Sequence, residues 1–171
     1  VYVLEGGYKA YRNRVLACFE KPWPFFVLAG NTGAGKTKVL HELEKRGEAV
    51  IDLEGIAHHK GSAFGNIGMP EQPGQEMFEN LLANELYIRR NQPIWIEDES
   101  IRIGHVNLPK SLWVWVGKCH HFMLDIPFEK RLEYTVAEYG KLPVEKMVNA
   151  IIRIKKRLGG LETKNAINAL I

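Results

Sequence analysis

The sequence predicts an α/β fold: a three-layer sandwich with a mainly parallel sheet and a helical C-terminal extension. Short apolar runs typical of buried strands alternate with longer segments of helical periodicity. The first long run, residues 25–29, leads directly into a glycine-rich segment at 30–37, and residues 38–46 then follow a helical pattern. A strand, a glycine-rich turn and a helix in this order indicate a P-loop NTPase-like domain.

Length and composition agree with a single globular domain. The chain has 171 residues, of which 46% are hydrophobic and 25% charged. We place residues 1–20 as a segment with its connector that either completes another domain or packs as an appendage on this one, and residues 21–171 as the P-loop domain. No apolar segment reaches the length of a membrane span and no signal-peptide pattern opens the chain, so we expect a cytoplasmic protein without a membrane partner. Cys18 and Cys119 form no C-x-x-C pair, and we expect buried thiols.

Residues 30–37 match the pattern G-x-x-x-x-G-K-[ST] at every fixed position. Glycines let successive backbone N–H groups point into one concavity, and the next helix adds its positive N-terminal end, so a diphosphate or triphosphate fits there. Lys36 is expected to reach the terminal phosphates, and the Thr37 hydroxyl to bind Mg²⁺. The predicted phosphate-binding residues are Gly30, Asn31, Thr32, Gly33, Ala34, Gly35, Lys36 and Thr37.

A second strand at 49–51 delivers Asp52 and Glu54 at its end. In an open parallel sheet the ligand crevice lies outside the carboxyl ends of the strands. Asp52 is therefore a candidate magnesium ligand, through water, or a catalytic base. Capping of a helix or an ion pair explains the same residue equally well.

Another apolar run, residues 93–96, ends in four polar residues at 97–100, as a Walker-B strand does. Glu97 or Asp98 would hold magnesium through water, with Glu99 as a candidate base; a surface acidic turn is the alternative. Arg102 follows closely and could bind an anion, which completes a predicted catalytic set of Asp52, Glu97, Asp98 and Arg102.

The remaining pattern predicts helices around the sheet. The expected elements are a short strand at 1–4, helices at 8–20 and 76–90, a long loop at 55–68, a segment of undecided structure at 109–117, a fourth core strand at 120–126, a helix from Pro127, and helices at 147–158 and 161–171. Arg131 sits early on the helix after Pro127, where it could approach a phosphate or pair with a carboxylate. Cations at 153 and 155–157 favour either the helix dipole or a nucleic-acid backbone.

Several blocks in the same order resemble the tRNA 2-selenouridine synthase family. They are residues 4–12, the P-loop, D-L-E-G at 52–55, H-K-G-S-A-F-G at 59–65, F-E-N at 78–80, E-D-E-S at 97–100 and I-K-K-R-L-G at 154–159. The resemblance implies an enzyme that converts 2-thiouridine at the tRNA wobble position to 2-selenouridine. Such enzymes use selenophosphate and an S-geranylated intermediate made from geranyl diphosphate.

The resemblance also implies a partner. Family members join a rhodanese-like domain, which carries the catalytic cysteine, to a P-loop domain, and residues 1–20 resemble the tail of the former. The loop would hold geranyl diphosphate, ATP or GTP with Mg²⁺, and the tRNA would lie on Lys60, Arg153, Lys155, Lys156 and Arg157. Two alternatives stay open: a small-molecule kinase with Asp52 as base and Arg131 in a lid, and a non-catalytic tRNA-binding subunit gated by a nucleotide.

Overall fold

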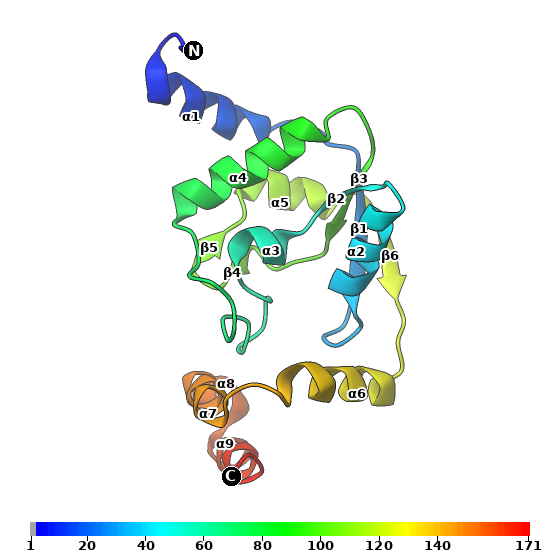
Figure 1. Cartoon of the computed structure of the whole chain (residues 1–171), viewed down its shortest axis with the longest axis vertical. Coiled ribbons are helices and arrows are strands. Elements are labelled where there is room, and N and C mark those ends of the chain that lie inside the picture. Colours follow the sequence, from blue (N-terminus) through cyan, green and yellow to red (C-terminus); the bar gives the residue numbers. More distant parts are fainter. Residues whose placement is uncertain (1–2) are drawn as a thin grey trace.

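The computed structural model describes residues 3–171 (Figure 1). The strand expected at 1–4 falls partly outside the described residues, and Val3 and Leu4 are not in a strand. The first element is helix α1 (Gly7–Cys18), which packs against helix α4 (Gln75–Ile88). A connector with two prolines then leads into the sheet.

Four parallel strands form the central sheet. They are β1 (Phe25–Gly30), β2 (Ala49–Ile51), β3 (Ile94–Glu97) and β6 (His120–Leu124), in the order β2-β3-β1-β6. Val27 of β1 lies opposite Ile96 on one side and His121 on the other. All four strands therefore end at the same edge, which confirms the mainly parallel sheet.

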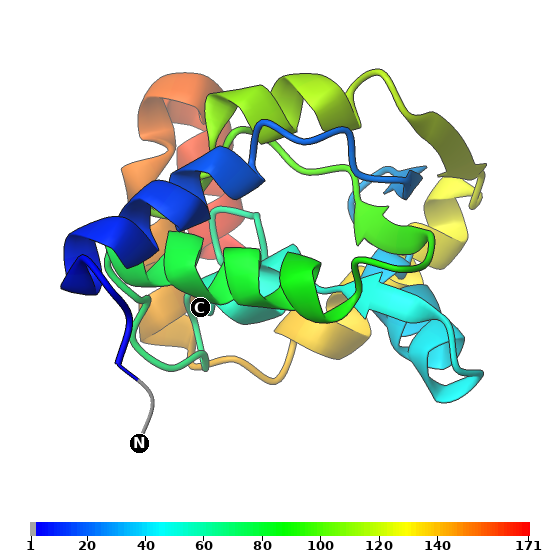
Figure 2. The ribbon, with the colours of Figure 1, turned by 90° about the horizontal axis from the view of Figure 1, so that it is seen from above.

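Alternating side chains give the sheet two covered faces. Phe25 and Val27 belong to the large core cluster, to which α4 and helix α5 (Lys110–Val116) also contribute. Leu28 and Val50 point to the opposite face and pack with Leu40 of helix α2 (Lys36–Lys45). The sheet thus lies between two helical layers (Figures 1 and 2), and the predicted three-layer architecture is confirmed.

Three segments differ from expectation or resolve an open question. The undecided segment 109–117 is the helix α5, because Leu112 and Val116 both reach the core from one side of it. The loop expected at 55–68 begins within a short helix, α3 (Leu53–Ala57), which Asp52 caps. A small antiparallel hairpin of β4 (Arg102–Ile103) and β5 (Val106–Asn107) was not expected.

Strand β6 lies at the edge of the sheet. It pairs only with β1 among the described strands, and His120 to Met123 are exposed. A strand forms in the segment 120–126 as predicted, but most of its side chains are exposed, so the prediction that it belongs to the core is wrong. A run of aromatic and apolar residues such as 120–124 does not distinguish an edge strand from a central one.

The C-terminal extension is helical, as predicted. It consists of α6 (Phe128–Tyr139), α7 (Val144–Arg153), α8 (Lys155–Leu158) and α9 (Gly160–Asn168), and α7 packs with α8 and α9 beyond α6 (Figure 1). The single helix expected at 147–158 is interrupted at Ile154. Within residues 3–171, every helix is too short or too polar to cross a bilayer.

The packing of α4 gives a direct test. Leu82 is fully buried in the core, whereas its neighbour Leu81 is 41% exposed. We expect Leu82→Ala to lower the free energy of unfolding by about 2 to 5 kcal/mol, since it removes buried methyl groups and leaves a cavity. Leu81→Ala is the matched control, with an expected change within about 0.5 kcal/mol. Chemical denaturation measures both; equal losses would contradict the burial described.

Candidate functional site

The glycine-rich loop forms an open pocket at the carboxyl edge of the sheet. Strand β1 ends at Gly30 and helix α2 begins at Lys36, and Gly33 and Gly35 both have φ of 79°, a conformation that favours glycine. The Lys36 ammonium donates a hydrogen bond to the Gly30 carbonyl, with an N–O distance of 2.9 Å. Residues 31–38 line a pocket of about 410 Å³. Backbone amides and a lysine around such a space can hold a phosphate group.

Helix α6 packs directly against this loop. A side chain at Gly33 would place its Cβ 2.6 Å from the Arg131 carbonyl oxygen and 2.6 Å from the Thr135 hydroxyl, so only glycine permits this approach. The Arg131 guanidinium donates to the carbonyls of Thr32 and Ile126, both at 3.1 Å. Arg131 therefore fastens the loop to α6 through carbonyl oxygens, and none of its described hydrogen bonds goes to a carboxylate.

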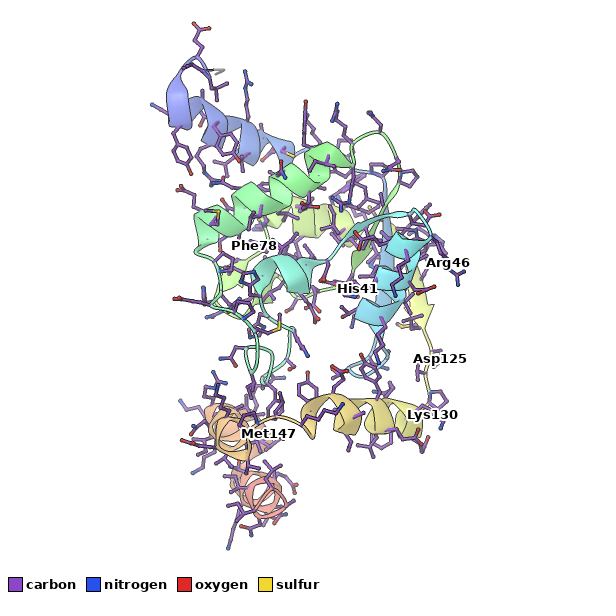
Figure 3. The ribbon with its side chains drawn as sticks, in the orientation of Figure 1. His41, Arg46, Phe78, Asp125, Lys130 and Met147 are labelled. Carbon is purple, nitrogen blue, oxygen red and sulfur yellow. The ribbon has the colours of Figure 1, made fainter. Side chains whose placement is uncertain are left out.

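Asp52 lies at the end of β2 and lines the pocket, but its carboxylate already has two partners. One oxygen caps α3 by accepting from the Gly55 amide at 2.7 Å, and the other lies 3.2 Å from the ring of His41. His41 is labelled on α2 in Figure 3. The capping interpretation is thus confirmed. Any catalytic role of Asp52 would have to use this same carboxylate.

The most buried carboxylate of the site is Glu97, at the end of β3. It is 1% exposed and accepts a hydrogen bond from the Glu54 amide at 2.7 Å. Glu54 in turn accepts from the Thr37 hydroxyl, at 3.3 Å. A chain of hydrogen bonds therefore links the end of β3 to the first turn of α2, and it brings Glu54, rather than Asp52, against the threonine of the P-loop.

Three carboxyl groups of the site bind protons unusually well. Burial, with the charges of Glu99 and Asp52, raises the pKa of Glu54 to about 7. Burial likewise raises the pKa of Glu97 well above its usual value, with Asp52 adding to it, and burial raises the pKa of Glu99. Lys36 lowers the pKa of Glu54 and Glu99, but desolvation outweighs it. Negative charge here lacks compensation, which favours a cationic ligand.

The side chains present could hold a magnesium ion together with a phosphate. Within residues 3–171, no three histidine, cysteine or acidic side chains converge closely enough to hold a metal by themselves. The Thr37 hydroxyl and Glu54 lie side by side and could supply two oxygen ligands. Mg²⁺ typically takes one or two protein oxygens and completes its octahedron with phosphate oxygens and water.

The loop after α3 covers the acids and reaches α6. A side chain at Gly61 would come within 3.0 Å of the Glu99 carboxylate and 3.1 Å of Glu54, so the backbone lies directly over both groups. Lys60 pairs with Glu138 at 3.4 Å, and the hydroxyls of Ser62 and Tyr139 are 3.0 Å apart. The pocket is thereby walled by the P-loop, the loop at 58–68 and α6.

Two residues of the predicted catalytic set are exposed outside the pocket. Asp98 faces solvent, and its amide extends the sheet by donating to the Leu28 carbonyl. Arg102 is exposed on the β4–β5 hairpin, where it donates to the Gly104 carbonyl at 2.9 Å. Successive side chains of an extended backbone point to opposite sides, which explains why Glu97 and Glu99 turn inward while Asp98 turns outward.

The predicted tRNA-binding residues are spread over separate places. Lys60 lines the pocket. Arg153 contacts the loop at 58–68, here called the covering loop: its guanidinium lies 3.4 Å from the Ala63 carbonyl oxygen and 3.3 Å from the Asn66 side-chain oxygen. Lys155, Lys156 and Arg157 are exposed on α8.

From the sequence, Arg131 is the residue of α6 predicted to approach a phosphate, and the inward face of the helix is not assigned to the pocket. Its inward side chains are spaced as one helical face, and they are Tyr134, Thr135, Glu138 and Tyr139. Polar and aromatic residues at i, i+1, i+4 and i+5 were a usable signal, since such spacing places them together. Glu54 and Glu99 follow apolar strands in the sequence, but nothing in the sequence favours them over Asp98.

Comparison with known proteins identifies relatives of this chain. The sequence model of the tRNA 2-selenouridine synthase AAA domain matches residues 23–171. A tRNA 2-selenouridine synthase of Sulfurovum sp. (strain NBC37-1) is 39% identical over an alignment that covers 94% of this chain and 49% of the relative. Those of Hydrogenovibrio crunogenus and Marinobacter nauticus are 38% and 34% identical, over 92% and 99% of this chain and 48% and 51% of theirs.

The chain thus spans about half the length of these curated relatives. No solved structure matches it. The family match covers the P-loop, the acidic strand ends and α6, which are the parts that build the pocket. The chain therefore belongs to the tRNA 2-selenouridine synthase AAA domain family.

Proposed function

We propose that this chain is the phosphate-binding half of a tRNA 2-selenouridine synthase, and that it presents a diphosphate donor to a wobble 2-thiouridine. The observation that carries the proposal is the pocket itself, in which the P-loop, Lys36 and the Thr37–Glu54 pair face one space. The relatives are named tRNA 2-selenouridine synthases, and the chain spans about half of each. A rhodanese-like domain or subunit would supply the remainder, with selenophosphate used by the complete cytoplasmic enzyme.

The donor is proposed to be geranyl diphosphate, with ATP or GTP as the alternative occupant of the P-loop. Amides of the loop and Lys36 would bind the diphosphate oxygens, and Thr37 with Glu54 would hold Mg²⁺. Bound magnesium would supply further positive charge to the leaving diphosphate. The sulfur of 2-thiouridine forms a bond to the geranyl carbon while the carbon–oxygen bond breaks, diphosphate leaves with the electron pair, and the base releases its N3 proton to solvent. Stabilisation of that charge is the contribution of Lys36 and the amides.

Removal of the lysine tests the proposal. We expect Lys36→Ala to weaken geranyl diphosphate binding in titration calorimetry by about tenfold or more, since a hydrogen bond from a charged group is worth about 1.5 to 3 kcal/mol. Mass spectrometry of 2-thiouridine tRNA, incubated with the chain, magnesium and geranyl diphosphate, should show an S-geranyl product that this variant fails to form. Lys45→Ala, on the exposed end of α2, is the control. Unchanged affinity for geranyl diphosphate and for nucleotides would refute the site.

Glu54 predicts a pH dependence. Its pKa of about 7 is raised, so the group is neutral below that pH and anionic above it. In the absence of magnesium, diphosphate affinity should fall as pH rises through about 7, because the new negative charge lies beside Lys36 and repels phosphate. Glu54→Gln should flatten this decrease, and Glu42→Gln, on the exposed side of α2, should leave it unchanged. Identical pH profiles for the two variants would argue against Glu54 as the titrating group.

The exposed cations of α8 are proposed to bind the tRNA backbone. Changing Lys155, Lys156 and Arg157 together to glutamine should weaken tRNA binding and reduce its salt dependence by about 0.7 to 0.9 in log–log slope for each phosphate that is no longer neutralised. The pair Lys45 and Arg46, also exposed and located at the C-terminal end of α2, provides a control that removes charge elsewhere. A slope that stays the same would remove α8 from the tRNA interface.

A further inference from the structure

A second and larger groove lies at the opposite end of the sheet. Helices α1 and α4 run side by side (Figure 2), joined by Arg12, which pairs with Glu79 and donates to Asn80. Between α1, the connector that follows it and the C-terminal part of α4 lies a space of about 820 Å³. Pro24 and Asn91, which line it, precede β1 and β3. The groove is therefore at the amino ends of the strands, whereas the P-loop is at their carboxyl ends.

The floor of this groove is apolar and held in place. Val15, Trp23 and Ala83 are each no more than 6% exposed. The Trp23 indole donates to the Cys18 carbonyl at 2.9 Å, and the Trp115 indole donates to the Trp23 carbonyl at 2.8 Å. Both hydrogen bonds fix the connector against the domain. A preformed floor of this kind can accept a flat apolar surface with little reorganisation.

The rims of the groove are cationic on both sides. Arg14 and Lys21 stand on the side of α1 and the connector, and Arg90 on the side of α4, all three exposed. Among the described residues that line the groove, none is acidic. Such an arrangement is complementary to a ligand that carries several negative charges.

An exposed aromatic residue, Tyr87, also lines the groove. Tyr87 is 61% exposed, although its side chain is large and partly apolar. The guanidinium of Arg90 lies over the ring, 4.2 Å from its centroid, and donates to the Tyr87 carbonyl at 2.9 Å. The arginine therefore holds Tyr87 from one side, and an incoming planar group can stack beside the pair. The side-chain amides of Asn84 and Asn91 provide hydrogen-bonding groups along the same wall.

We propose that this groove binds single-stranded RNA. One unstacked base would lie on Tyr87, and the flanking phosphates would bind Arg14, Lys21 and Arg90. Single-strand binding sites combine a basic groove with an exposed aromatic side chain, and this groove has both. The inference goes beyond the proposed function, because it adds an RNA site remote from the P-loop and from α8. An extended substrate could then engage both ends of the sheet.

The test uses the full chain and a fluorescent single-stranded oligouridylate. Tyr87→Leu should weaken binding about tenfold, in the range found for the removal of one stacked base, while Tyr87→Phe keeps the ring and should keep the affinity. Arg14→Gln combined with Lys21→Gln should reduce the log–log salt slope by about 1.4, since each neutralised phosphate of a single strand contributes about 0.7. Lys45→Gln with Arg46→Gln is the matched control and should change neither quantity. Circular dichroism verifies that each variant is folded.

The outcomes separate this inference from the proposed function. Loss of binding with the α8 variants alone, and none with the groove variants, would overturn the groove while leaving the tRNA surface on α8 intact. Equal effects of Tyr87→Leu and Tyr87→Phe would show that stacking is not involved and would also overturn it. Binding of free uridine monophosphate as tight as that of the strand would contradict an RNA site. Ultraviolet crosslinking of the RNA to the peptide that contains Tyr87 is the positive result expected.

Discussion

The hydrogen bond from the Glu54 amide to the buried Glu97 carboxylate is the interaction on which the site depends. It joins the start of α3, just after β2, to the end of β3, and so fixes the positions of two neighbouring strand ends relative to each other. Glu54 can meet the Thr37 hydroxyl because its backbone is held in this way. A carboxylate that is 1% exposed would be costly without such a partner, and the amide supplies one.

Charge at the pocket follows from the same packing. Glu54, Glu97 and Glu99 are brought together, Glu97 fully buried and the other two partly buried, and their pKa values rise because the charged forms lose solvation. Lys36 is the cation placed to offset them, and it is also the residue expected to reach a phosphate. A magnesium diphosphate would bring both signs of charge to the site. Its cation would face the acids while its phosphates face the lysine and the loop amides.

Helix α6 gives the pocket its third wall and connects the phosphate site to the C-terminal helices. It touches the P-loop at Gly33 and the covering loop through Tyr139 and Glu138. Arg153 of α7 also holds the covering loop. RNA bound along α8 would therefore lie on helices whose contacts extend to the pocket. The groove beside Tyr87 would bind the strand at the far end of the sheet.

The sequence by itself determined the α/β class, the P-loop and the expectation that acids meet at strand ends, because these follow from local spacing and the two-residue period of a strand. The tertiary structure alone decided which acids face inward. Glu97 and Glu99 rather than Asp98 turn inward, since the phase of a short strand depends on which neighbour buries it. It also decided that residues 110–116 are helical and that β6 is an edge. Trp and Val in 110–116 suit a helix or a strand, so packing of Leu112 and Val116 into the core decided for the helix. Pairing with β1, which is distant in sequence, placed β6 in the sheet.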